Sequence, residues 1–359
     1  MGKLIYLDSA ATTKPKFFRS THKDFWMNSN TPYTRTKEQL ELEKAKEKIK
    51  SCLGVRGGYV LFFRCATEAI EWLVDKMTKK YKYIETWCSP FEHESVFNVS
   101  KWSLCESTKD FFDVIAYKIL YCHQLVNQIT GDIWDIQNIA KSLKPNQFFG
   151  VDLTAAIGHT ILPNDFEDYC DALWFSGHKF YAEKNIGTMW ISDRLGEYLG
   201  ASKDPKNQHN LVHGTVDVAG VRMISDALVW CVWCVKDKQL LSPKHWYELY
   251  SFLNNKFAEQ NIDSALVYSN IFDKSYAINA IYLRGINADA LQTYLASKDI
   301  YIGVAHSACA GTEDYRVLEA MGFNKKIASQ TIRVSFNVDS NYDDIKRLVN
   351  EINNFRRLF

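Results

Sequence analysis

Short apolar runs alternate with longer stretches of helical spacing along residues 38–191. Residues 38–53 carry apolar side chains at helical spacing and are followed by Gly54, which predicts an amphipathic helix with a stop. Compact apolar runs predict buried strands, and they lie at residues 59–63, 83–87, 148–153, 172–175 and 187–191, with one or two more expected within 113–121. Strands that alternate with helical segments in this way are typical of a parallel α/β sheet.

The pattern changes near residue 237. Polar residues and Pro243 interrupt a long helical stretch there, and the rest of the chain mixes helices with strands expected at residues 277–283 and 331–336. We therefore predict a large domain over residues 14–236. Residues 1–13 and 237–359 are predicted to form a smaller α+β domain.

Composition narrows the class of protein without identifying a function. The 359 residues are 47% hydrophobic and 24% charged, with a formal net charge of +1, which is ordinary for a globular protein and gives no basic field for nucleic-acid binding. The N-terminus becomes polar too early for a signal peptide, and the longest apolar run, residues 227–235, is too short for a membrane span. Nine cysteines without framework spacing predict reduced thiols in the cytoplasm.

The first candidate for chemistry is Lys179. The apolar run 172–175 leads directly into Ser176, Gly177, His178 and Lys179, and in open α/β sheets ligands bind at the ends of strands. A lysine held there, away from bulk water, loses proton affinity and becomes a usable amine nucleophile. Taken alone, this residue is more often a surface lysine in a loop.

Other expected strand ends also carry polar side chains. Asp152 and Lys179 each close a strand, which suggests a pyridine cofactor: the lysine would form its Schiff base and the carboxylate would keep its ring nitrogen protonated. His93 could stack on such a ring and move protons. Thr67 begins a predicted helix, where backbone N–H groups can bind an anion. Taken singly, a buried aspartate is usually a cap or ion-pair partner, and a lone histidine is usually structural.

Together these residues belong to motifs that follow one another along nearly the whole chain. The motifs are Tyr6–Thr13, Ala66-Thr67-Glu68, Glu92-His93, Val151–Gly158, Ser176–Lys179, Gly214-Thr215, His306–Cys309 and Thr331–Ser335. In this order they resemble the cysteine desulfurases of the class V aminotransferase family. The resemblance implies fold type I of the pyridoxal phosphate-dependent transferases: a large domain with a mainly parallel seven-stranded sheet flanked by helices, and a smaller α+β domain that carries the catalytic cysteine loop.

The resemblance also implies roles for single residues. Lys179 would bind pyridoxal 5′-phosphate, and His93 would assist proton transfer. The other cofactor-binding residues would be Ala66, Thr67, Gln128, Asp152, Ser176 and His178, with Thr215 reaching the neighbouring active site of a homodimer. The substrate would be bound by Arg333, whose guanidinium offers two parallel donors to a carboxylate, and by Ala11 and Thr12.

By the same resemblance, Cys309 is the nucleophile. Its thiolate would attack the sulfur of L-cysteine, which becomes L-alanine while Cys309 carries a persulfide. A sulfur-acceptor protein would then receive the sulfur for iron–sulfur cluster assembly or thiolation. Two alternatives stay open: another class V enzyme of the selenocysteine or cysteine lyase type, and a degenerate relative that binds a partner and has little activity.

Several positions depart from the family pattern. Arg64-Cys65 replaces Ser-Gly before the phosphate-binding helix, and Gln128 and Ala155 replace the two amide residues that approach the phenolic oxygen of the cofactor. We expect Gln128 to reach that oxygen alone. The loop after Cys309 is short and contains Glu313 and Asp314, which suggests one dedicated acceptor protein, and His306 replaces a glycine and could stabilise the Cys309 thiolate.

The remaining cysteines are expected to be structural. Cys231 and Cys234 have metal or redox spacing, but two ligands do not complete a zinc site, and the pair lies in an apolar helical run. We therefore predict core packing for both and no metal site in the chain.

Overall fold

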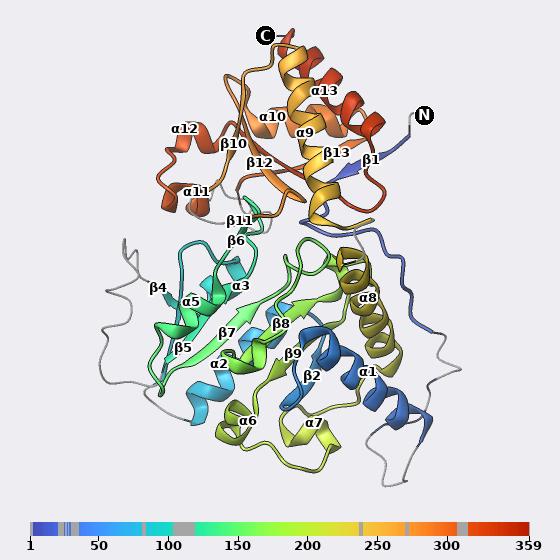
Figure 1. The fold of residues 1–359 in the computed structure, drawn as a ribbon, viewed down its shortest axis with the longest axis vertical. Helices are drawn as coiled ribbons and strands as arrows, with labels where there is room; N and C mark the ends of the chain where they lie inside the picture. Colours follow the sequence, from blue (N-terminus) through green and yellow to red (C-terminus); the bar gives the residue numbers. More distant parts are fainter. Residues whose placement is uncertain are drawn as a thin grey trace.

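A computed structural model describes residues 3–20, 25, 27, 29, 36–80, 84–102, 119–236, 240–269, 273–306 and 315–358. These residues form a seven-stranded sheet below a five-stranded sheet in the view of Figure 1. The strands of the larger sheet lie in the order β2 (Tyr59–Phe63), β9 (Gly187–Ile191), β8 (Ala172–Ser176), β7 (Phe148–Asp152), β5 (Ile119–Gln124), β3 (Glu85–Cys88) and β4 (Lys101–Trp102).

The seven-stranded sheet is mainly parallel, as predicted. Strands β8, β7, β5, β3 and β4 pair in parallel, and β9 is antiparallel to both of its neighbours. Every residue of β5, β7, β8 and β9 is buried, which is characteristic of a sheet covered on both faces. The strands predicted at 59–63 and 187–191 match β2 and β9 at both ends. Most of the strand region predicted within 113–121 lies outside the described residues. The description resumes at Ile119, the first residue of β5.

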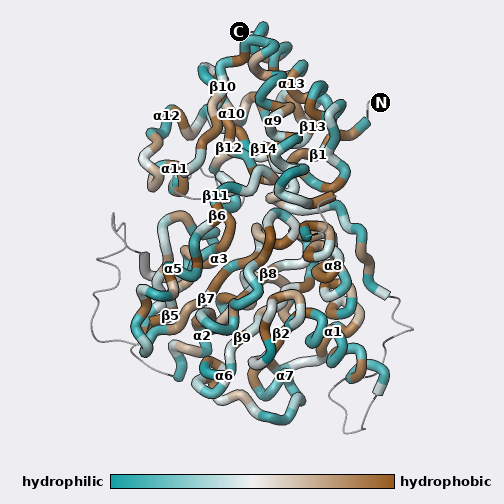
Figure 2. The backbone as a smooth tube through the Cα atoms, viewed as in Figure 1, coloured by the Kyte–Doolittle hydropathy of each residue, from teal (hydrophilic) through white to brown (hydrophobic). Residues whose placement is uncertain are grey.

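Helices cover the two faces of this sheet. One hydrophobic cluster joins α1 (Lys37–Leu53) and α8 (Val218–Lys236) to one face, and a second joins α2 (Ala66–Lys80) and α6 (Asp193–Leu199) to the other. The strand β8 shows how the alternation of side chains serves both clusters, because Leu173 belongs to the first and Trp174 to the second. Figure 2 shows apolar residues concentrated along the central strands, inside these layers.

The ends of α1 follow from local sequence. Thr36 and Gln39 form a capping box at its start, and Gly54 ends it with a positive φ of 66°. Helix α8 packs along α1 and is long and apolar enough to cross a membrane by length and composition, but 67% of that stretch is buried. This burial is that of a core helix, and Cys231 and Cys234 lie buried within it, as predicted.

The five-stranded sheet has the order β1 (Ile5–Leu7), β13 (Ile300–Val304), β14 (Thr331–Ser335), β12 (Ile278–Leu283) and β10 (Ser264–Val267). The N-terminal strand β1 pairs in parallel with β13, with Ile5 opposite Ile300. The N-terminal segment therefore lies against the C-terminal part of the chain, while the predicted domain boundaries themselves stay predictions. The helices of this part are α9 (Pro243–Glu259), α10 (Ala288–Ala296), α11 (Arg316–Ala320), α12 (Lys325–Ala328) and α13 (Tyr342–Arg356).

Small elements connect or border the sheets. Strand β6 (Asp132–Ile133) pairs with β11 (Asp273–Lys274) between the two sheets (Figure 1), and the remaining short elements are α3 (Glu94–Phe97), α5 (Ile136–Lys141), η1 (Phe166–Asp168), η2 (Gly177–Lys179) and α7 (Lys206–Asn210).

Within α7, consecutive residues have left-handed backbone angles, with φ of 47° at Asn207, 48° at Gln208 and 63° at His209. This conformation presents the buried Gln208 side chain to the outer strand β2. Its Oε1 accepts from Phe62 N at 2.6 Å, and its Nε2 donates to Phe62 O at 3.2 Å.

Candidate functional site

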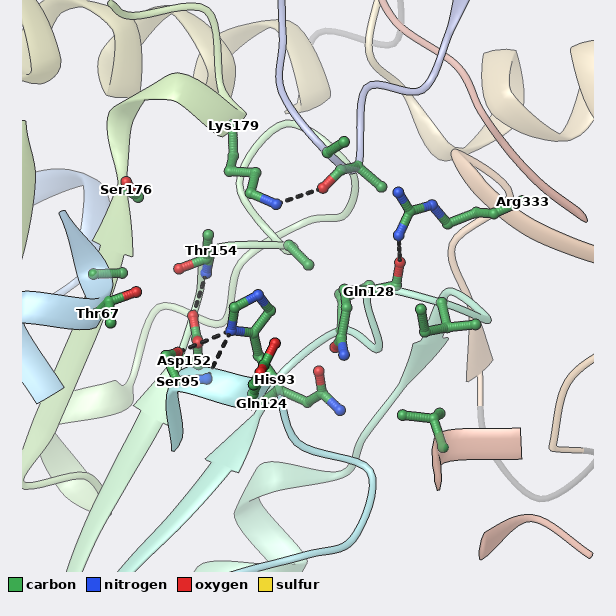
Figure 3. Close-up of a pocket in the computed structure, with 18 of the residues that line it drawn as sticks. Thr67, His93, Ser95, Gln124, Gln128, Asp152, Thr154, Ser176, Lys179 and Arg333 are labelled. Carbon is green, nitrogen blue, oxygen red and sulfur yellow. Dashed lines mark hydrogen bonds between the residues drawn. The ribbon is translucent and has the colours of Figure 1, made fainter. Parts of the chain in front are cut away.

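A cavity of about 390 Å³ lies where the strand ends of the larger sheet face the smaller sheet. Most of the predicted site residues line this cavity, namely Ala11, Ala66, Thr67, His93, Gln128, Asp152, Ser176, His178, Lys179 and Arg333. Figure 3 shows the labelled residues arranged around one space, with Lys179 and Asp152 on one side and Arg333 on another. Cys309 lies outside the described residues.

Lys179 is held between the end of β8 and the N-terminal segment. It ends the single turn η2 (Gly177–Lys179), which directly follows β8. Its Nζ donates to Ala10 O at 2.6 Å (Figure 3). Thr12 Oγ1 donates to His178 O at 3.1 Å, so the Thr12 hydroxyl supports the lysine turn, and Thr12 is not among the residues that line the cavity.

Asp152 is the last residue of β7, the strand next to β8. Its Oδ1 accepts from Thr154 N at 2.7 Å, and burial raises the pKa of the carboxyl group. Among the described residues no cationic side chain forms an ion pair with it. The charge of Lys179 opposes this rise in pKa only as a minor cause, so the buried acid fits a ligand that brings a positive charge of its own, as a protonated pyridine nitrogen does.

His93 caps the short helix α3. Its Nδ1 accepts from Ser95 N at 3.1 Å, so the hydrogen-bond network assigns the proton of the neutral ring to Nε2. Burial, followed by the charge of Lys179, lowers the pKa of His93 to about 4. The ring is therefore neutral near pH 7, and its other nitrogen faces away from Ser95 into the cavity (Figure 3).

The N-terminus of α2 forms the end of the cavity suited to an anion. The helix begins at Ala66, so Thr67 lies in its first turn, where unbonded N–H groups and the helix dipole favour a phosphate. Ser176 Oγ lies 2.9 Å from His178 Nδ1 beside it. Arg64 adds no charge here, because its side chain is 80% exposed and pairs with Glu68 at 3.2 Å.

Arg333 enters the cavity from β14. It is 5% exposed, and its Nη2 donates to Asp8 Oδ1 at 2.8 Å while its Nη1 donates to Gln128 O at 3.1 Å. Gly303 lies opposite in β13, where any Cβ would approach Arg333 Nε to 2.8 Å. Within the described residues Arg333 Nε and Gln128 Oε1 are buried without a hydrogen-bond partner, so this wall keeps polar atoms that a bound molecule could satisfy.

The structure adds cavity residues outside the motifs, chiefly Ser95, Gln124 and Arg316, and also Thr154, which lies within the motif 151–158 but was given no role. Ser95 and Thr154 lie two residues after His93 and Asp152, and each donates its backbone N–H to the side chain of that residue. Gln124 ends strand β5, whose first part was predicted but whose end was not. No sequence pattern around Arg316 indicates a place in the site, because its contacts are with residues distant in the sequence.

Three further expectations concern residues away from the described cavity. Thr215 is exposed and is not among the residues that line the cavity. His306 Nε2 lies 2.7 Å from Asp289 Oδ1 of α10, so its imidazole has a carboxylate partner; its effect on the Cys309 thiolate stays a prediction. Among the described residues, no group of three His, Cys, Asp or Glu side chains could hold a metal ion.

Comparisons with known proteins match almost the full length of this chain to one family. The model of the family described as "Aminotransferase class-V" matches residues 5–348. A relative named "Cysteine desulfurase IscS" from Buchnera aphidicola subsp. Schizaphis graminum is 26% identical over 388 residues, covering 98% of this chain and 92% of the relative. Another of that name from Clostridium botulinum is 24% identical over 387 residues, covering 96% and 92%.

The fold is shared with solved structures. A structure titled "NIFS-LIKE PROTEIN" superposes with a TM-score of 0.82 at 20% identity, covering 99% of this chain and 100% of that chain. A NifS-like protein from Rickettsia africae superposes with a TM-score of 0.77 at 18% identity, covering 99% and 100%. At these identities the likeness concerns the fold, which is fold type I.

Proposed function

The chain belongs to the class-V aminotransferase family, and from that premise we propose that it is a pyridoxal 5′-phosphate-dependent cysteine desulfurase. The observation that carries the proposal is the joint placement of Lys179 and the buried Asp152 at neighbouring strand ends in one cavity, opposite Arg333. The first two suit a pyridine aldehyde and the third suits an amino-acid carboxylate.

The residues present fit this cofactor. Lys179 would hold it covalently, Asp152 would hold its ring nitrogen, and Ala66, Thr67, Ser176 and His178 would surround its phosphate at the start of α2. When bound, the cofactor supplies an electron sink for the substrate carbon atoms.

The side chains of the cavity would then bind and orient L-cysteine. Arg333 would bind the substrate carboxylate through the donors that Asp8 and Gln128 leave available. Ala11, which lines the same cavity, would limit the space beside the substrate. His93, neutral with its proton on Nε2, would hold a proton near the reacting group.

Cys309 is the proposed nucleophile. Its thiolate would form a bond to the substrate sulfur while the bond between that sulfur and Cβ breaks. The electron pair of the broken bond stays with Cβ, which takes up a proton, so the products are L-alanine and a persulfide on Cys309. We further propose that the enzyme is a cytoplasmic homodimer in which Thr215 reaches the neighbouring site, and that a sulfur-acceptor protein for iron–sulfur cluster assembly or thiolation receives the sulfur.

The test is to supply the cofactor-loaded protein with L-cysteine and a reductant, and to measure sulfide and alanine. We expect both products in equal amounts from the unaltered protein and neither from Cys309→Ser. In a parallel reaction without the reductant, we expect an extra sulfur atom on the Cys309 peptide. Cys52→Ser is the matched control, because Cys52 lies in α1 outside the cavity.

Two results would overturn the proposal. Elimination products in place of alanine would indicate a lyase. A loaded protein that releases neither alanine nor sulfide would instead agree with a partner-binding relative of little activity.

A further inference from the structure

The turn before His93 is held from the other side of the cavity by Arg316. This arginine is the first residue of α11, and its Nη1 donates to Pro90 O while its Nη2 donates to Glu92 O at 2.8 Å. Its guanidinium carbon lies 3.8 Å from the ring centroid of Phe97, the last residue of α3. The guanidinium therefore bridges both ends of the segment that contains His93.

A second side chain also binds this turn. Gln124, at the end of β5, donates from Nε2 to Phe91 O at 2.5 Å. With the two bonds from Arg316, the carbonyl groups of all three residues before His93 are held by side chains from separate elements. Backbone carbonyls held in this way leave the His93 Cα little room to move.

The imidazole itself is fixed at one nitrogen. Nδ1 accepts from Ser95 N at 3.1 Å and lies 2.9 Å from Ser95 Oγ. This acceptor role leaves the ring proton on Nε2, the nitrogen that faces the cavity. Nε2 of the neutral ring could accept a proton only if the ring proton were on Nδ1. In that tautomer the hydrogen bond from Ser95 N would be lost.

We propose that Arg316 is a positioning residue, which holds the turn 90–92 so that His93 presents Nε2–H to the cavity as a neutral hydrogen-bond donor. The use of that donor in the reaction rests on the proposed function; the orientation of the ring does not. In this proposal His93 stabilises negative charge on a group of the substrate or cofactor, and it does not act as a base through Nε2.

The experiment measures the two ring nitrogens of His93 by NMR in ¹⁵N-histidine-labelled protein, with and without the cofactor, and assigns them with His93→Gln. We expect the unaltered protein to show a protonated Nε2 and an unprotonated Nδ1. In Arg316→Gln the two signals should move toward an average of both tautomers, and Arg316→Lys, which keeps one charged donor group, should restore part of the difference. Arg284→Gln is the control, because Arg284 is 71% exposed in an ion pair with Asp263.

Kinetics give the second measurement. We expect kcat of Arg316→Gln to fall about tenfold, because the Nε2–H donor of His93 is misplaced but not removed. KM for L-cysteine should be unchanged, because Arg333 is untouched. A proton on Nδ1 in the unaltered protein, or unchanged nitrogen signals in both Arg316 variants, would overturn the positioning role. If Arg316→Gln does not fold, the signals of Arg316→Lys decide. Absence of sulfide from the unaltered protein would instead contradict the proposed function, and the nitrogen signals would still test the orientation of His93.

Discussion

The two walls of the cavity use different chemistry. The wall from the seven-stranded sheet, which we call the strand-end wall, presents groups whose charge depends on pH and burial. Among them are a buried carboxyl group at Asp152 and an imidazole at His93. The wall from the five-stranded sheet and its helices presents the guanidinium groups of Arg333 and Arg316, which keep their charge at any ordinary pH. The first wall is suited to holding protons and to offering them in hydrogen bonds, and the second to binding fixed negative charge and backbone carbonyls.

The walls also differ in how the chain builds them. Asp152 and Lys179 follow adjacent parallel strands, so their proximity comes from the register of β7 and β8. Arg333 lies inside β14, and its side chain is oriented by Asp8, 325 residues away along the chain. A change on the first wall should therefore act mainly on chemistry, and a change on the second mainly on binding and positioning.

The largest expected effect is that of Asp152→Asn. A neutral amide cannot hold a proton on the ring nitrogen of a cofactor, so we expect kcat for alanine formation to fall by at least about 10²-fold. KM for L-cysteine should change little. The matched control is Asp168→Asn, which alters an exposed carboxylate in η1. A normal kcat in Asp152→Asn would contradict the role given to the strand-end wall.

A smaller effect is expected from the opposite wall. Arg333→Gln removes charge-assisted hydrogen bonds to the substrate carboxylate, each worth about 1.5–3 kcal/mol, so KM should rise roughly 10- to 100-fold. Steady-state assays over a range of L-cysteine concentrations measure this. Arg333→Lys should recover only part of the loss, because an ammonium lacks the planar pair of donors. A fall in kcat of Arg333→Gln without a rise in KM would contradict the substrate-binding role assigned to Arg333.

A third prediction concerns the stability of the fold and not catalysis, at Glu92 in the turn before His93. Burial raises the pKa of Glu92 from 4.5 to about 8. In the pH window between these two values, the folded chain therefore keeps a proton that the unfolded chain has lost. The stability that this proton contributes is present at low pH and is lost as the pH rises through that window. In Glu92→Gln, which cannot ionise, the free energy of unfolding should decline less over the same window, by on the order of a few kcal/mol.

Urea unfolding at the two ends of this pH window measures the difference between Glu92→Gln and the unaltered protein. The control is Glu71→Gln, which changes an exposed side chain of α2. Equal pH slopes for the Glu92 variant and the unaltered protein would mean that Glu92 is ionised in the fold.

The sequence predicted the strand-end wall better than the opposite one, for a physical reason. Apolar runs reveal buried strands, and a polar residue that closes such a run, such as Asp152, is visible without a structure. The contacts of Arg316 with Pro90 and Glu92 depend on how the two parts of the chain pack together, and no local pattern encodes them. The motifs include both Arg333 and Asp8 but do not indicate that the two side chains pair, because that pairing is a property of the sheet. The role predicted for Thr215 would need a second chain, which the contacts within one chain cannot indicate.

One side chain also decides where the larger sheet stops. β2 is its outer strand, and the amide group of Gln208 occupies both the N–H and the C=O of Phe62. Those are the groups to which another polypeptide would add as a further strand. The left-handed turn at residues 207–210 thus opposes the addition of a further strand at Phe62, on the strand that leads directly into the cavity residues Cys65 and Ala66.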